Sequence, residues 1–316
     1  MTVLSLRRAF VGLACASAAL LSACGSSTVE SQLAPSRVIA FGDAFSVVTP
    51  GAKYSVNDGA TNNWVSQFAA SYGQSVAPSA SGGLVYAQGN ARIVNKPDAA
   101  GSSSTLTVKE QIDAFLAGKS LGSSDVVLLN GGISDIVVGM AAVTAGSMTE
   151  DQLLSVATQA GTDLGAQVRR LVSAGGQHVV VVGSYNLGVS PWANALGKSD
   201  LLRNASAKLN EAMLVSIVDL GASVLYVDAP YYFNLVHDAP NNYGMSNSTG
   251  IACTSNDPGP GIGIGANEVN SSLCTPSTIA AGVTYDQYLF ADKLYFTPVA
   301  NRLFGLYAYD RVHARW

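Results

Sequence analysis

The chain has 316 residues, of which 48% are hydrophobic and 12% charged, and its formal net charge at pH 7 is −4. This length and apolar content are sufficient for one sizeable hydrophobic core, so a single large domain is the simplest organisation. The net charge is slightly negative and the sequence has no Lys/Arg clusters. The chain therefore lacks the positively charged patch that binding to a phosphate backbone requires. Nucleic acid is therefore not expected as a partner.

The N-terminus has the layout of an export signal. Arg7 and Arg8 precede an apolar run at residues 9–21, which leads into Leu-Ser-Ala-Cys ending at Cys24. A short positive segment followed by a short hydrophobic segment and small residues is typical of secretory signal peptides. The run is too short to span a bilayer comfortably, which disfavours a transmembrane helix; an ordinary cleaved signal peptide stays an alternative.

The four residues that end at Cys24 resemble a bacterial lipobox, in which cleavage leaves an acylated cysteine as the first residue of the mature chain. The resemblance implies a lipoprotein signal peptide over residues 1–23, a lipid anchor on Cys24 that binds a membrane, and a flexible Ser/Gly-rich tether over residues 24–36. Gly25 occupies the position where an inner-membrane lipoprotein would carry Asp. We therefore expect a location in the cell envelope, at the outer membrane, on its periplasmic or surface face.

Two cysteines are then left for the mature fold. Cys15 lies within the expected signal peptide, so Cys253 and Cys274 remain. An oxidising periplasm or cell exterior favours a disulfide between them, which would close the Gly/Pro-rich loop that they bracket. A metal site is the alternative, but two cysteines without a nearby His are too few ligands, and we expect no metal or other cofactor.

Short β-branched runs alternate with longer amphipathic segments from Arg37 onward, an order typical of a parallel sheet covered by helices. The expected elements are strands at residues 37–41, 125–129, 178–182 and 223–227, and helices at residues 61–72, 107–117, 149–174, 200–220 and 297–309. The predicted fold is one α/β domain over residues 37–309, a three-layer α/β/α doubly wound parallel sheet, with a C-terminal tail at residues 310–316. Such sheets bind ligands beyond the carboxyl ends of their strands.

The first expected strand is followed directly by Phe-Gly-Asp-Ala-Phe-Ser at residues 41–46. This block resembles the Gly-Asp-Ser-x-Ser block of the GDSL/SGNH hydrolases, a family of esterases and lipases in which the first Ser attacks an ester carbonyl. The resemblance implies the flavodoxin-like SGNH fold for the domain. Ala44 occupies the position of the attacking Ser, and Ser46 matches the second Ser, whose usual role is structural.

Three further blocks follow in the family's order. From the first block to the fourth, the resemblance extends along nearly all of the mature chain. Residues 82–92 read Gly-Gly-Leu-Val-Tyr-Ala-Gln-Gly-Asn-Ala-Arg and place Asn90 at the Gly of the family's oxyanion hole. Residues 130–136 read Asn-Gly-Gly-Ile-Ser-Asp-Ile and place Ser134 at the oxyanion Asn. Residues 288–298 read Tyr-Leu-Phe-Ala-Asp-Lys-Leu-Tyr-Phe-Thr-Pro, so Asp292 is kept while Tyr295 replaces the base His.

These substitutions remove much of the chemistry that the resemblance implies. A Ser hydroxyl is a poor nucleophile unless an adjacent His takes its proton and an Asp orients that His. Ala44 has no oxygen, and Tyr295, with an ordinary pKa of about 10, is protonated at neutral pH and unsuited to act as the base. Ser134 keeps a hydroxyl donor and Asn90 a backbone N–H, although losing one oxyanion donor typically costs ~100- to 1000-fold in rate.

Displaced residues are the alternative route to hydrolysis. Ser46 lies two residues from the expected nucleophile, but we interpret it as a turn or capping residue. His313 belongs to an Asp-x-x-His sequence in the expected tail, which lacks the family's Pro-Thr continuation, and we interpret it as part of a coincidental surface pair. Ser134 with Asp135 is a third candidate, but it lacks a base.

The other histidines and one Gly-rich run are interpreted as structural. His178 opens a Val-rich strand, and His237 lies in a loop or helix end beside Asp238. Residues 259–265, Gly-Pro-Gly-Ile-Gly-Ile-Gly, are similar to a dinucleotide or phosphate loop. They follow no expected strand, open no helix and contain no Lys, so a flexible loop closed by the disulfide is the better interpretation.

Two functions are compared. The first is a non-catalytic envelope protein that keeps the family scaffold and has a binding or structural role, with an acyl ester, lipid or glycan as ligand. The second is an active hydrolase of acyl or lipid esters that works through Ser46 and His313. The first is preferred because the positions of the nucleophile, the base and both oxyanion groups are altered together. An artificially inactivated variant would account for Ala44 alone.

Overall fold

The computed structural model describes Ser31, residues 33–61 and residues 63–316. Leu33–Trp316 forms one compact unit. The expected signal peptide, the anchor at Cys24 and most of the expected tether lie outside the described residues. Leu33 packs against the hydrophobic core, four residues before the expected domain boundary at residue 37.

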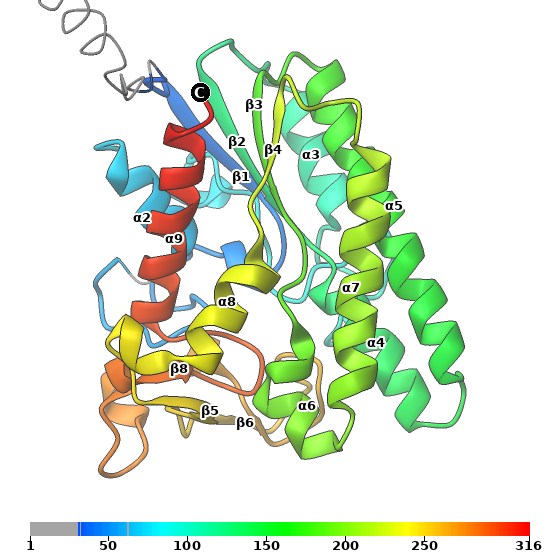
Figure 1. Cartoon of the computed structure of the whole chain (residues 1–316), viewed down its shortest axis with the longest axis vertical. Helices are drawn as coiled ribbons and strands as arrows, with labels where there is room; N and C mark the ends of the chain where they lie inside the picture. The colour runs from blue at the N-terminus through cyan, green and yellow to red at the C-terminus, as the bar shows by residue number, and fades with distance from the viewer. Residues whose placement is uncertain (1–30, 32, 62) are drawn as a thin grey trace, which may run out of the picture. The chain divides into compact units, whose positions relative to one another are not determined.

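A four-stranded parallel sheet forms the centre of the unit (Figure 1). Its strands are β1 (Arg37–Phe41), β2 (Asp125–Asn130), β3 (His178–Val182) and β4 (Val224–Tyr226), in this spatial order. All six residues of β2 are buried, as expected for a parallel strand covered on both faces. The four predicted strands are therefore confirmed, with small differences at their ends.

A short segment extends the sheet beyond β1. The backbone N–H of Ala40 donates to the carbonyl of Leu84 at 3.0 Å, and the N–H of Tyr86 donates back to the carbonyl of Ala40 at 2.8 Å. Val85 thereby forms an isolated parallel bridge with Ala40. The second motif block thus lies beside the strand that carries the first.

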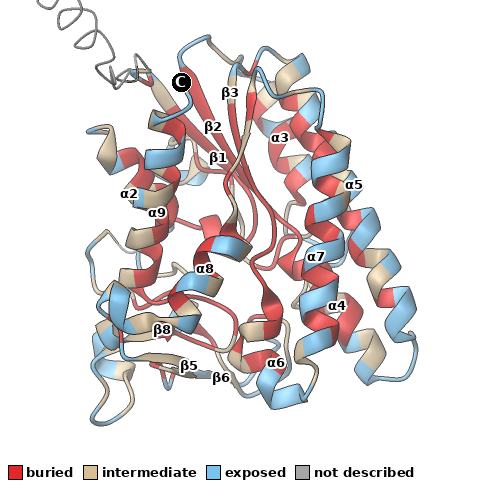
Figure 2. Ribbon diagram, viewed as in Figure 1, coloured by how far each residue is buried: buried red, intermediate tan, exposed pale blue. Residues whose placement is uncertain are grey.

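Helices cover both faces of the sheet, which gives the three layers of an α/β/α fold. One face carries α2 (Trp64–Ser71) and α9 (Pro298–His313); the other carries α3 (Val108–Leu116), α4 (Ile133–Thr144), α5 (Glu150–Ser173) and α7 (Ser199–Ser216) (Figure 1). Figure 2 shows the buried strands between helices whose outer faces are exposed. The prediction of an α/β fold with a central parallel sheet is confirmed.

None of the helices in the described part of the chain combines the length and the hydrophobicity that a membrane span needs.

The helices at residues 61–72, 107–117, 149–174, 200–220 and 297–309 are found close to their predicted positions. Three helices were not predicted: α4, α6 (Pro191–Leu196) and α8 (Ala229–Asp238). The expected tail at residues 310–316 is partly wrong, because α9 continues to His313. No Gly or Pro ends the helix earlier, and Trp316 is fixed by a ring contact with His178 at a centroid distance of 4.9 Å.

Two small sheets accompany the long C-terminal loops. β5 (Asn247–Ile251) pairs in parallel with β8 (Tyr288–Phe290), and β6 (Asn256–Asp257) pairs antiparallel with β7 (Glu268–Val269). Cys253 and Cys274 form the expected disulfide, with Cα atoms 6.0 Å apart. The disulfide closes the loop that contains β6, β7 and the Gly-rich run.

Candidate functional site

The candidate site lies where β1 and β2 end. Asp43 follows β1, and its Oδ1 accepts hydrogen bonds from the backbone N–H of Phe45 at 3.0 Å and from Nδ2 of Asn130 at 2.6 Å. Asn130 is the last residue of β2, so this bond ties the two strand ends together. Burial raises the pKa of Asp43 to about 6.

Ala44 opens the 3-10 turn Ala44–Ser46 and is only 1% exposed. Its methyl group belongs to the hydrophobic core and offers no attacking oxygen. The turn directly follows the strand, as an attacking residue in this position requires. Residue 44 therefore lies just beyond the carboxyl end of β1 with a side chain that cannot act as a nucleophile.

Ser46 is a buried link between three elements. Its Oγ donates to Oδ1 of Asn130 at 2.5 Å and accepts from Nε1 of Trp64 at 3.1 Å. Both bonds hold the hydroxyl within the core, and no His takes part in them. The structural role expected for Ser46 is present, although as a buried bridge rather than as a helix cap.

Asn90, which the resemblance aligns with the oxyanion-hole Gly, has a φ of 62°, in the left-handed region that Gly and Asn adopt most readily. Its Nδ2 donates to the carbonyl of Gly261 at 2.8 Å, while its Oδ1 is buried without a hydrogen-bond partner among the described residues. Gly261 belongs to the loop closed by the disulfide. Asn90 therefore holds this loop against the candidate site.

Ser134 lies in the first turn of α4, and its buried Oγ has no hydrogen-bond partner in the described part of the chain. The neighbouring Asp135 is not a free carboxylate: it accepts from Nε of Arg92 and from the N–H of Ile93, both at 3.0 Å. This ion pair joins the second motif block to the third. Asp135 acts here as a connector rather than as a partner for Ser134.

Asp292 is fully buried and its carboxylate is occupied by backbone groups. It accepts from the N–H groups of Ser271 at 2.9 Å, Leu294 at 2.8 Å and Tyr295 at 2.7 Å. Burial raises the pKa of Asp292 to about 6 against the opposing effect of these donors. Asp292, which the resemblance aligns with the Asp of an Asp-His pair, thus orders the local backbone.

Tyr295 is 1% exposed, and its backbone N–H donates to the buried carboxylate of Asp292. Burial is the main cause that raises the pKa of its phenol well above the usual value, and the negative charges of Asp43 and Asp292 add to it. The phenol consequently stays protonated at neutral pH and cannot accept a proton from a nucleophile. The fourth motif block lies beside the turn after β1, where Phe296 packs against Phe45 with ring centroids 5.7 Å apart.

Tyr54 is a site residue that the sequence did not reveal. Its ring packs against the ring of Tyr295 with centroids 5.2 Å apart. A Cβ atom added to Gly89 would lie 1.9 Å from the Tyr54 hydroxyl, so the missing side chain of Gly89 makes room for this phenol. The loop that carries Tyr54 contains no motif and no periodicity. The sequence therefore gives no signal that Tyr54 lies beside Tyr295.

The structure does not bring His313 to Ser46. Phe45 and Phe304 contact each other with ring centroids 5.5 Å apart, so the middle of α9 lies beside the candidate site. From Phe304 to His313 the helix rises about 13 Å. His313 stacks on Tyr309, and the nearby Trp316 contacts His178, the first residue of β3, at the amino ends of the strands. Ser46 instead follows the carboxyl end of β1, so the two residues of the displaced triad lie at opposite ends of the sheet's strands.

The remaining histidines have the structural positions expected of them. His178 is the first residue of β3, and His237 lies in the last turn of α8 with its Nδ1 3.0 Å from Oδ1 of Asp238. No group of three or more His, Cys, Asp or Glu side chains in the described residues is arranged to hold a metal ion.

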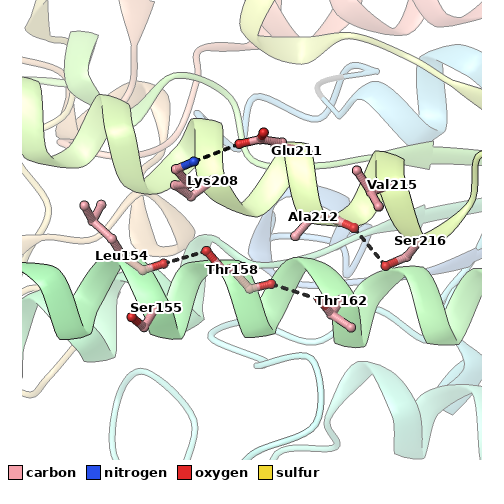
Figure 3. A pocket seen from close by; sticks show the side chains of 9 residues that line it. All are labelled: Leu154, Ser155, Thr158, Thr162, Lys208, Glu211, Ala212, Val215 and Ser216. Atoms are coloured by element: carbon pink, nitrogen blue, oxygen red, sulfur yellow. Dashed lines mark hydrogen bonds and ion pairs between the residues drawn. The ribbon is translucent and has the colours of Figure 1, made fainter.

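A groove of about 560 Å³ lies elsewhere, between α5 and α7 (Figure 3). The hydroxyls of Thr158 and Thr162 donate to carbonyl oxygens of their own helix, and Lys208 forms an ion pair with Glu211 at 3.0 Å. The polar side chains of the groove therefore largely form hydrogen bonds or ion pairs within their own helices. None of the residues that line the groove belongs to the four motif blocks.

Comparisons with known proteins do not identify the chain. No protein-family model matches it, and no curated protein matches it. One solved crystal structure aligns with 88% of this chain and 96% of its own chain, with a TM-score of 0.46 and 15% sequence identity. This likeness is too weak to assign a family or a function.

Proposed function

We propose that this chain is an exported, lipid-anchored protein of the outer membrane, built on the doubly wound scaffold of the SGNH/GDSL hydrolases, that no longer hydrolyses esters. In this proposal residues 1–23 are the signal peptide, Cys24 carries the lipid, and the folded domain has a binding or structural role in the envelope. The ligand class that the resemblance implies is an acyl ester, a lipid or a glycan.

One observation carries the proposal. In the alignment that the resemblance gives, Ala44 and Tyr295 replace the attacking oxygen and the proton acceptor. Both side chains are buried, and their neighbours Phe45 and Phe296 contact each other with ring centroids 5.7 Å apart. The loss is compounded by Asp292, whose carboxylate is occupied by three backbone N–H groups. An acyl-enzyme route needs all three functions together, so their joint replacement removes the route.

The contacts between the motif blocks support the alignment on which the proposal depends. The second block lies beside β1 and is joined to the third by the ion pair between Arg92 and Asp135. The fourth block contacts the first through the rings of Phe296 and Phe45, whose centroids are 5.7 Å apart. The four blocks were selected by resemblance alone, and these contacts join them near the carboxyl ends of the strands. Doubly wound folds bind their ligands at these strand ends.

Covalent labelling tests the proposal. The purified full chain is incubated with a fluorophosphonate probe and, separately, with short p-nitrophenyl esters, beside an active serine esterase as positive control. We expect neither labelling nor turnover above the rate without protein. Labelling of the wild-type chain would overturn the proposal, and labelling that disappears in Ser46→Ala would establish Ser46 as a displaced nucleophile.

A further inference from the structure

A second cavity lies at the carboxyl end of β3, apart from the residues of the candidate site. It measures about 180 Å³ and is bounded by the loop after β3, by α7 and by the start of α8. Most of its wall surface is apolar, but five of its seven lining residues have polar side chains: Asn186, Arg203, Ser206, Asn210 and Asn234. None of them belongs to the four motif blocks, so the hydrolase resemblance assigns this cavity no role.

The orientation of two amides in this wall follows from one backbone group. The N–H of Gly188 donates to Oδ1 of Asn186 at 3.0 Å, which fixes which end of that amide is the oxygen. Nδ2 of Asn186 must then donate to Asn234, and it does so at Oδ1, at 2.9 Å. The Nδ2 of Asn234 is left as a donor without a partner among the described residues.

Arg203 supplies a positive charge to the same wall. A Cβ on Gly188 would lie 2.8 Å from the Cβ of Arg203, so the absent side chain allows α7 to approach the loop. Only Nη1 of the guanidinium is engaged, with Asp200 at 2.7 Å, and both partners of this ion pair are exposed. A guanidinium has five N–H donors, so most of them are free to bind a ligand.

The other polar side chains of the wall are committed to the protein. Ser206 donates to the carbonyl of Leu202 at 2.9 Å and accepts from the N–H of Leu187 at 3.1 Å. Asn210 binds both the N–H and the carbonyl of Ser184, at 3.0 and 2.7 Å. The side-chain groups left for a ligand are thus N–H donors with one positive charge, a set that recognises an anion.

We propose that this cavity binds a small monocarboxylate, with Arg203 and Asn234 donating to its two oxygens. A volume of about 180 Å³ corresponds to ~6 water molecules, which limits the ligand to a few heavy atoms. One guanidinium whose charge is shared with Asp200 balances a single negative charge better than the double charge of a phosphate. The site is independent of the proposed loss of ester hydrolysis.

The test is an NMR titration of the ¹⁵N-labelled full chain with sodium lactate at pH 7 and constant ionic strength, with glycerol and sodium phosphate as comparison probes. Saturable shifts of the side-chain amides of Asn186 and Asn234 with lactate are expected. Arg203→Gln should weaken lactate binding ~10-fold or more, because charge-assisted hydrogen bonds are lost. Asn234→Asp, which keeps the shape and adds a negative charge, should abolish binding.

Two further variants complete the design. Asp200→Asn frees the guanidinium from its partner and should strengthen lactate binding. Lys208→Gln, on the same helix but lining the separate groove between α5 and α7, should leave binding unchanged. Shifts that do not saturate, an equal loss in Lys208→Gln and Arg203→Gln, an equal response to glycerol, or tighter binding of phosphate than of lactate would each overturn the proposal.

Discussion

The ring of Tyr54 packs edge-on against the ring of Tyr295, with centroids 5.2 Å apart and an interplanar angle of 68°. Tyr54 also takes the space that the missing side chain of Gly89 leaves open. Tyr295, which the proposed alignment places at the base His, is therefore covered by a second aromatic side chain. On this proposal the replacement changes the shape of the candidate site as well as its proton chemistry.

Restoring the missing groups separates these two effects. Ala44→Ser with Tyr295→His, together with Ser134→Asn and Asn90→Gly, is expected to give weak turnover of p-nitrophenyl esters. Adding Tyr54→Ala should raise that rate by about tenfold or more, since access and position of the acyl group govern reaction rates steeply. Tyr54→Ala in the otherwise unchanged chain should stay inactive, which serves as control. A folded, restored chain without activity in either form would show that more of the cleft has been remodelled.

Ser46→Ala tests the buried bridge between the turn after β1, β2 and α2. The change removes the donor to Asn130 and leaves Nε1 of Trp64 buried without its acceptor. We expect the free energy of unfolding to fall by about 1 to 3 kcal/mol, the usual effect of unsatisfied buried polar groups. Urea denaturation followed by tryptophan fluorescence measures it. Ser155→Ala, an exposed position on α5, should change stability by less than ~0.5 kcal/mol; equal effects would contradict the role of Ser46.

The sheet and the longer helices were predictable because their periodicity is strong and local. The helix α4 was missed because its residues are almost uniformly apolar and its first turn, Ser134 included, was read as part of a motif block. The small sheets, two to five residues per strand, depend on pairing between distant Gly-rich segments. The motif blocks predicted that the segments of Ala44 and Tyr295 lie together beyond the carboxyl ends of the strands. The contact of Tyr54 with Tyr295 could not be predicted, because the loop that carries Tyr54 has no repeating pattern.

The buried carboxyl of Asp43 makes stability depend on pH. Its pKa is raised to about 6, above an unfolded value of about 4, so between these pH values the folded chain keeps a proton that the unfolded chain loses. Its contribution to stability is therefore present at pH 4 and lost as pH rises through 6. Asp43→Asn keeps an acceptor for Phe45 and removes the titration.

The measurement compares the free energy of unfolding of the wild type and of Asp43→Asn between pH 4 and 7. The wild type should lose about 2 to 3 kcal/mol relative to the variant across this range. Asp292, whose pKa burial also raises to about 6, is present in both proteins and cancels in the difference. Parallel curves for the two proteins would contradict a raised pKa at Asp43.

Gly161 allows α5 and α7 to pack backbone to backbone. A Cβ at this position would lie 2.0 Å from the carbonyl oxygen of Leu209, and backbone cannot move aside as a flexible side chain can. Ala is intrinsically better than Gly in a helix by ~1 kcal/mol, so helix propensity alone predicts that Gly161→Ala stabilises the protein. We expect instead that the clash dominates and lowers the free energy of unfolding by about 2 to 4 kcal/mol. Gly118→Ala, where a Cβ meets nothing within 4 Å, is the control and should be neutral to slightly stabilising in the same urea titration. A gain of stability in Gly161→Ala would show that the two helices can separate without loss of packing.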